Sequence, residues 1–474
     1  MARQIIERHG GVVGMRARAL SRLRGAGSWT IVSNAVSMVG AMVVTSGLGV
    51  AYWLLAAHLF PRAAVGFAGA SISAMSLLGN MGMLGLGTLL IGELPHQPGE
   101  EKGLIATALA AAGAAGAALG LLFAWAAPLV SPTLQPLAGD GAVVGLFALG
   151  VALTSITAVL DQALIGLLRG GLQFGRNAVF AALKLAALVA AGVWLGKGDW
   201  LTIYATWVFG NLASLAGLIG FAALKGVRPR LRRLESRRYL LRRFGVRALA
   251  HHWLNLALQV PGFALPVIVT AILSPTANAY FYVASMVSGL VFFGPMALVT
   301  ALYAVGARSP AALAHRMRFT LGLALAAGVL VNVVLFAGAD KVLGLFGPAY
   351  AAKAGWTLRL LGLGVFPIII KDHYVTINRI RGAVTATALL ATAGSVLELA
   401  LAAMGAVGTG GLLGVAAGWL AALYIEAAVM APMVYRAAAR ADTDQPEPEP
   451  EQTGSTYTLA AVGAHGAGQG QDEL

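Results

Sequence analysis

The sequence predicts an all-α membrane protein of about twelve transmembrane helices, arranged as two parallel six-helix repeats. Three observations support this fold class. Hydrophobic residues make up 58% of the 474 positions and charged residues only 11%, whereas soluble domains carry about 25% charged residues. Apolar stretches longer than about 18 residues recur along the chain, and each can cross the hydrocarbon core of a bilayer. Finally, segments of the first half recur in the second half at one constant offset.

Charged residues, glycine and proline bound the apolar stretches and so place the predicted helices. In the first half the helices are expected at 29–57, 65–90, 104–129, 142–168, 177–195 and 201–224. In the second half they are expected at 248–273, 278–304, 319–337, 358–374, 383–405 and 410–435. The predicted domains are a basic amino terminus (1–28), an amino-terminal six-helix lobe (29–224), a basic linker (225–247), a carboxy-terminal six-helix lobe (248–435) and a disordered tail (436–474).

Most of the 33 Lys and Arg residues fall on one side of the predicted helices, with the densest run between Lys225 and Arg247. Basic loops of membrane proteins face the cytoplasm, so both termini are expected there, and the composition, rich in Ala, Gly and Arg, hints at a bacterial inner membrane. The net charge of +14 is then an orientation signal and not evidence of nucleic-acid binding. The first apolar run is too long for a signal peptide and is expected to be a retained anchor.

The internal repeat has an offset of 214 residues. It aligns Leu59, Pro61, Phe67, Ala70 and Ser71 with Leu273, Pro275, Phe281, Ala284 and Ser285. It also aligns Leu146, Leu149, Gly150 and Val151 with Leu360, Leu363, Gly364 and Val365. Six helices per repeat give both halves the same orientation, which is typical of transporters whose binding site lies between two lobes. Alternating access is therefore physically possible.

Three segments carry a resemblance to a known superfamily. They are Leu59-Phe60-Pro61-Arg62-Ala63-Ala64-Val65-Gly66-Phe67 with Gly85-Leu86-Gly87, Asp161-Gln162-Ala163-Leu164-Ile165-Gly166, and Leu345-Phe346-Gly347-Pro348-Ala349-Tyr350 with Ala354 and 358–361. They resemble Wzx-like polysaccharide flippases of the multidrug/oligosaccharidyl-lipid/polysaccharide exporter superfamily. Glu93 departs from the pattern, because many relatives have a basic residue there. This departure puts in doubt any head-group contact assigned to that position.

The resemblance implies a transporter that flips a polyprenyl-(pyro)phosphate-linked sugar or oligosaccharide across the membrane for surface polysaccharide assembly. Its implied partners are membrane lipid, the anionic lipid-linked sugar, H⁺ or Na⁺ as coupling ion, and other polysaccharide-assembly proteins, with no cofactor. Two alternatives stay open. One is a cation-coupled multidrug antiporter of the same superfamily, for which an acid in the first three helices is expected but missing. The other is a non-transporting membrane scaffold.

Buried ionisable groups are costly in a bilayer and mark candidate ion or substrate pathways. Asp161 and Lys184 fall at matching depths on neighbouring antiparallel helices, so we expect them to pair, either as a functional site or as a structural ion pair. Glu398 lies deep in the eleventh helix with no cationic neighbour in sequence, and Glu426 lies in the twelfth. Either could carry a proton or be a hydrogen-bonded structural acid.

Lys371, Asp372, His373 and Arg379 are expected at the cytoplasmic end of the tenth helix. They either meet a pyrophosphate there or form a solvated helix end. Pro261 and Pro367 are expected to kink their helices, and His251 and His252 to be interfacial residues or, with Asn255 and Gln259, to line a cavity.

Enzymatic chemistry is not indicated. The chain has no cysteine, which excludes disulfides and thiol nucleophiles. Adjacent helical positions such as His251 and His252 point about 100° apart, so no metal site is expected from them. No phosphate-binding loop, nucleophile elbow or zinc-protease motif is found either.

Overall fold

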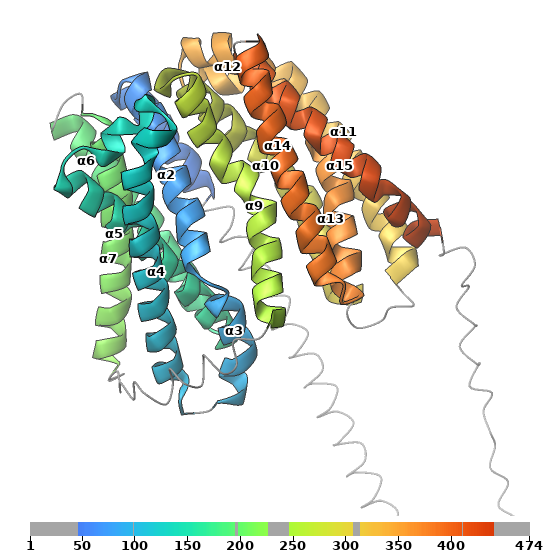
Figure 1. Cartoon of the computed structure of the whole chain (residues 1–474), viewed down its shortest axis with the longest axis horizontal. Helices are drawn as coiled ribbons and strands as arrows, with labels where there is room; N and C mark the ends of the chain where they lie inside the picture. The colour runs from blue at the N-terminus through green and yellow to red at the C-terminus, as the bar shows by residue number, and fades with distance from the viewer. Residues whose placement is uncertain are drawn as a thin grey trace, which may run out of the picture.

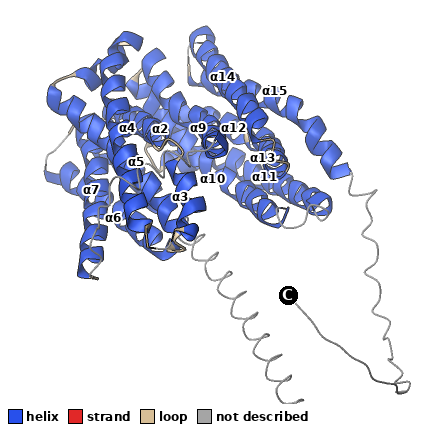
Figure 2. Cartoon of the chain, turned by 60° about the horizontal axis from the view of Figure 1, so that its bottom comes forward, coloured by secondary structure: helices blue, strands red, loops and turns tan. Residues whose placement is uncertain are grey.

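We describe the protein from a computed structural model, in which residues 46–97, 99–194, 198–225, 246–306, 313–409 and 411–439 are described. Within these ranges every regular element is a helix (Figure 2). Among the helices of these described ranges, eleven are long and apolar enough to cross a membrane, and a shorter apolar helix, Ser46–Leu59, precedes them. The predicted fold class is confirmed. The predicted basic amino terminus, nearly all of the linker and most of the tail lie outside the described residues.

The described part of the first half, from residue 46 to residue 225, contains nine helices, two of them short 3₁₀-helices (η1 and η2). They are Ser46–Leu59, α2 (Arg62–Gly82), α3 (Leu86–Glu93), η1 (Leu94–His96), α4 (Glu101–Val130), η2 (Pro132–Ala138), α5 (Gly141–Gly166), α6 (Gly170–Trp194) and α7 (Trp200–Leu224). Those of the second half are α9 (Val246–Ile272), α10 (Pro275–Gly306), α11 (Leu313–Gly344), α12 (Pro348–Leu363), α13 (Val365–Ile380), α14 (Val384–Thr409) and α15 (Leu412–Ala439).

Two predicted helices are interrupted. The second, expected as one helix over 65–90, divides into α2 and α3 because Leu84 and Gly85 have φ angles of 50° and 75°. The left-handed region ends an α-helix, and glycine enters it at little cost. The tenth, expected at 358–374, extends from Pro348 to Ile380 and is interrupted at Gly364. The expected tail begins later than residue 436, because α15 continues to Ala439.

The halves stand side by side, with the first half at the left of Figure 1 and the second at the right. Between them α2 packs on α9 and α10. We call the upper end in Figure 1, where α12 lies, the α12 end, and the lower end, where α3 lies, the α3 end. Pro61 and Pro275, which the repeat aligns, stand just before α2 and at the start of α10.

The halves touch closely at the α12 end. Gly66 of α2 lies against the backbone of Pro275, so that a Cβ at Gly66 would collide with the Pro275 carbonyl oxygen. Asn278 Nδ2 donates to the Gly66 carbonyl over 2.7 Å, and Ser131 Oγ donates to the Ala271 carbonyl over 3.0 Å. The glycine therefore permits a backbone contact that holds the two halves together at this end.

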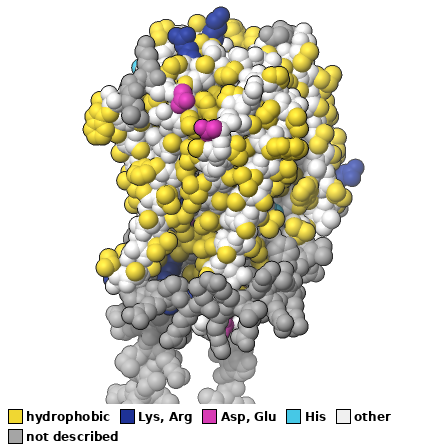
Figure 3. Space-filling model, turned by 60° about the vertical axis from the view of Figure 1, so that its left-hand side comes forward, with side chains coloured by type: hydrophobic (Ala, Val, Ile, Leu, Met, Phe, Trp, Pro, Cys, Tyr) yellow, Lys and Arg dark blue, Asp and Glu magenta, His cyan; other side chains and the backbone are white. Residues whose placement is uncertain are grey.

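Large apolar side chains cover the outside of the helices. Figure 3 shows this surface on the side of the first half, where apolar side chains are spread over the whole described face and few charged side chains interrupt them. Exposed members include Trp125 and Leu129 of α4, Trp194 of α6 and Ile219 of α7. An apolar lateral surface of this extent is what contact with lipid requires.

Candidate functional site

A cavity of about 550 Å³ lies between the two halves. The first half lines it from α2 and α7, and the second half from α9, α10, α12, α13, α14 and α15. Its position and volume are those of a small-molecule binding site, for which about 300–1,000 Å³ is usual. Pro261 and Pro266 of α9 both lie on its wall, inside a helix that continues to Ile272.

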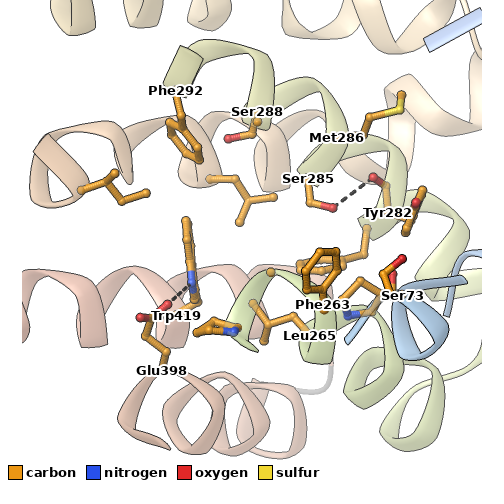
Figure 4. Close-up of a pocket in the computed structure, with 18 of the residues that line it drawn as sticks. Ser73, Phe263, Leu265, Tyr282, Ser285, Met286, Ser288, Phe292, Glu398 and Trp419 are labelled. Atoms are coloured by element: carbon orange, nitrogen blue, oxygen red, sulfur yellow. Dashed lines mark hydrogen bonds between the residues drawn. The ribbon is translucent and has the colours of Figure 1, made fainter. Parts of the chain in front are cut away.

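The lining combines aromatic rings with hydroxyl groups (Figure 4). Aromatic members are Trp207, Phe263, Phe281, Tyr282, Phe292 and Trp419. Serine members are Ser73 and Ser76 of the first half and Ser285 and Ser288 of the second. Ser288 is 2% exposed and its hydroxyl has no hydrogen-bond partner among the described residues. The cavity is therefore amphipathic, with hydroxyl groups contributed by both halves.

Three charged residues meet at the wall formed by the second half. Lys371 Nζ of α13 lies 2.8 Å from Glu398 Oε1 of α14 and 2.8 Å from Glu426 Oε2 of α15. Trp419 Nε1 donates to Glu398 Oε2 over 2.7 Å, a contact that is drawn in Figure 4. Lys371, Glu398 and Glu426 are 6%, 3% and 5% exposed, so one buried ammonium faces two buried carboxyl groups. We call these three residues the charged cluster.

Two glycines make room for this arrangement. A Cβ at Gly394 of α14 would collide with the carboxyl group of Glu426, and a Cβ at Gly364 would lie 2.7 Å from the ring of Trp419. Close packing of α14 on α15 therefore depends on a missing side chain at Gly394. Trp419 and Gly394 were not among the residues singled out from the sequence, because neither is ionisable.

The structure corrects two sequence interpretations here. Glu398 is not a lone carboxylate, because Lys371 and Trp419 both bind it. Lys371 and His373 do not belong to a solvated helix end, because they are 6% and 0% exposed. The tenth helix was expected to end near residue 374, whereas α13 continues to Ile380 and so moves Lys371 into the interior.

The other ionisable residues of α13 have different surroundings. Asp372 lines the cavity beside the charged cluster. His373, two residues after Lys371, faces α11 instead, where its Nε2 lies 3.4 Å from Thr320 Oγ1. Arg379, two turns nearer the α3 end, donates from Nη2 to Asn255 Oδ1 of α9 over 2.6 Å. His251 lies one turn before Asn255 and so shares its helix face.

The expected pair of Asp161 with Lys184 is not formed. Asp161 instead accepts from Arg176 Nη2 over 3.0 Å and from Asn177 Nδ2 over 3.2 Å. Lys184 Nζ lies 3.4 Å from the ring centroid of Trp207 and is also close to the rings of Tyr52 and Phe180. A buried ammonium can be stabilised by aromatic faces instead of a carboxylate. Counting residues along the two helices therefore predicted the wrong partner for each residue.

The internal repeat relates one buried charged residue of the first half to one of the second half. Its offset of 214 aligns Lys184 of α6 with Glu398 of α14, since 398 minus 184 is 214. Both are buried, and each contacts a tryptophan that lines the cavity, Trp207 or Trp419. Repeat-equivalent positions therefore carry a cation in one half and an acid in the other. Within the described residues no group of three or more His, Asp and Glu side chains is arranged to hold a metal ion.

No known protein-family model matches the sequence, and no curated protein is significantly similar to it. Solved structures are similar in fold. A multidrug resistance MATE family transporter of the MOP superfamily, in an inward-facing conformation, superposes with a TM-score of 0.61 at 16% identity, over 85% of this chain and 96% of that chain. The lipid II flippase MurJ, in an inward closed conformation, gives a TM-score of 0.62 at 14% identity, over 86% and 91%.

This chain has the fold of these transporters. A MATE structure in the straight conformation gives a TM-score of 0.58 at 15% identity, over 87% of this chain and 96% of that chain. Nearly the whole of each neighbour is therefore represented here. The neighbours are transporters and a flippase, and at these identities the similarity establishes the fold and not the substrate.

Proposed function

We propose that the protein flips a polyprenyl-(pyro)phosphate-linked sugar or oligosaccharide across the bacterial inner membrane by alternating access, for surface polysaccharide assembly. The observation that carries this proposal is the amphipathic cavity between the two halves. Its serine hydroxyls can bind sugar hydroxyls, and its aromatic rings can pack on the C–H faces of a sugar ring. A substrate with an apolar tail can leave that tail in the surrounding lipid.

Arg379 is the group that we assign to the phosphate. Arginine binds phosphate oxygens with paired N–H donors, and Asn255 already orients this side chain across α9 and α13. Lys371 is a poorer candidate, because two carboxyl groups already surround its ammonium. If the α3 end faces the cytoplasm, as the basic loops suggest, Arg379 lies on the side from which the lipid-linked precursor arrives.

The test compares two arginines of the same interrupted helix pair. Arg379→Ala should lower surface polysaccharide at least about tenfold in a deletion strain complemented with the variant, since a charge-assisted contact to phosphate is worth about 1.5 to 3 kcal/mol. The lipid-linked precursor should accumulate in the membrane. The control is Arg359→Ala, which removes an ion pair with the exposed Asp340 (2.8 Å) at the α12 end and should leave export near normal.

A second function has a specific observation in its favour. Asp372 and Glu398 line the cavity together with Lys371, and this excess of acid suits an organic cation. A cation-coupled multidrug antiporter therefore remains the alternative. A deletion strain with normal surface polysaccharide and increased drug sensitivity would replace the flippase proposal with this one.

A further inference from the structure

We propose that the charged cluster holds one exchangeable proton, carried by Glu426, and that Lys371 is a tethered cation that excludes sodium from the same site. The inference rests on the proposed transport function, to which it adds the coupling ion. It follows from the number of charges, from the contacts of each carboxyl oxygen and from the position of Lys371 and Glu398 on the cavity wall.

The first argument is charge balance. One ammonium and two carboxylates would leave one uncompensated negative charge among residues that are 3% to 6% exposed. Such a charge near the middle of a bilayer is costly, at least about 2.5 to 3.5 kcal/mol. Two carboxyl groups that share one site also disfavour each other's ionisation. A single bound proton removes both costs and leaves a neutral cluster.

The second argument assigns the proton to Glu426. Both oxygens of Glu398 already accept from donors, Oε1 from Lys371 and Oε2 from Trp419. Donors to both oxygens favour the ionised form of that carboxyl group. Glu426 has only the ion pair of its Oε2 with Lys371, and neither of its carboxyl oxygens has a hydrogen-bond partner among the described residues. The ionisable groups that act on Glu426 are Lys371 of α13 and Glu398 of α14.

The third argument concerns sodium. A hard metal ion needs several oxygen ligands around one point. The point between the two carboxyl groups is occupied by Lys371 Nζ, at 2.8 Å from each. The other oxygen of Glu398 already accepts a hydrogen bond from Trp419 Nε1 and is not free to bind a metal. The lysine therefore supplies the positive charge that a bound metal would supply, and only a proton can be added.

Glu426 is not among the residues that line the cavity, but Lys371, which contacts it, and Glu398 both are, so the proton can be exchanged with the cavity past these two side chains. On release, the Glu426 O–H bond breaks, the proton passes to water in the cavity, and the ammonium of Lys371 then faces two carboxylates. On binding, the reverse transfer restores the neutral cluster. Asp372 also lines the cavity beside the cluster.

The experiment uses the full chain in lipid nanodiscs and needs no transported substrate. Infrared difference spectra recorded across a pH titration should contain the C=O band of one buried protonated carboxyl group. Glu426→Gln and Glu398→Gln should each abolish the band, because one carboxylate then matches one ammonium. Asp340→Asn, which changes an exposed acid at the α12 end, should leave it. Glu426→Asp should shift the band, and Glu398→Asp should not.

A band that is absent from the unsubstituted protein, or that survives Glu426→Gln, would overturn the proposal. A shift on Glu398→Asp alone would overturn the assignment to Glu426. The thermal unfolding midpoint should be the same in sodium and in choline salts; a sodium-dependent rise that Glu426→Gln abolishes would show a metal site instead. Because none of these measurements involves export, a failure of the flippase proposal would be seen separately, in the Arg379→Ala strain.

Discussion

Gly394 is the residue on which the geometry of the charged cluster most directly depends. Its missing side chain leaves space for the carboxyl group of Glu426 between α14 and α15. Gly394→Ala should displace that carboxyl group and cost about 1–3 kcal/mol of stability through overpacking. The measurement is the thermal unfolding midpoint of the purified protein.

Gly408→Ala on the same helix is the matched control, because a Cβ there meets nothing within 4 Å. If both variants unfold at the same temperature, α14 and α15 do not pack as closely as described. If only Gly394→Ala is destabilised, the carboxyl group of Glu426 lies where the structure places it.

At the residue scale, the sequence identified which charged residues lie inside the protein better than it identified their partners. Lys371, Glu398 and Glu426 were all candidates, and the structure brings them together. Asp161 and Lys184 were also candidates, and the structure separates them. Depth in a membrane follows from counting residues along a helix. The direction in which a side chain points depends on helix rotation, which neighbouring helices decide.

The junction between α2 and α3 is the clearest feature at the scale of elements. Gly85 has a φ of 75°, a conformation that costs other residues about 1–2 kcal/mol. Gly85→Ala should therefore lower the unfolding midpoint. Gly92→Ala within α3 should leave it unchanged or raise it, because its helical backbone suits alanine and the site is open. Equal midpoints for the two variants would argue that this junction is not strained.

Helix bounds were predictable where hydrophobicity changes and were wrong where it does not. The ends of α5 and α7 agree with the predicted 142–168 and 201–224 to within a few residues. The interruptions at Leu84–Gly85 and at Gly364 lie inside continuous apolar sequence, so composition does not mark them. The sequence has a glycine at each interruption, but many other glycines of this chain lie inside uninterrupted helices, so glycine alone does not predict an interruption.

At the scale of the whole molecule, the close contact of Gly66 with Pro275 should control how the halves separate. Gly66→Ala should force α2 and α10 apart at the α12 end. Spin labels on Ala63→Cys and Lys353→Cys, which are both exposed and lie in different halves, should then be farther apart than in the protein with Gly66, as measured by double electron–electron resonance. The chain has no cysteine of its own, so only these sites would be labelled.

Gly217→Ala on α7, where a Cβ meets nothing within 4 Å, should leave the distance distribution unchanged. An unchanged distribution in Gly66→Ala as well would mean that this contact does not hold the halves together.

Sidedness is a second prediction at this scale. Most basic residues are expected on the cytoplasmic side, which would place the α3 end inside the cell. In intact cells a membrane-impermeant maleimide should label Lys353→Cys at the α12 end, whereas Lys102→Cys at the start of α4 should react only after permeabilisation. Both side chains are exposed, so burial does not limit either reaction. The reverse pattern would contradict the proposed orientation and the role of Arg379 in the cytoplasmic entrance.

The sequence by itself determined that this is an all-helical membrane protein of two repeats, because lipid demands long apolar segments and a repeat leaves a constant offset. Only the tertiary structure decided that Lys371 binds Glu398 and Glu426, that Lys184 lies among aromatic rings, and that one cavity joins the halves. Transfer into lipid is a property of each segment alone. Ion pairing depends on the rotation and close approach of three separate helices, which no local pattern records.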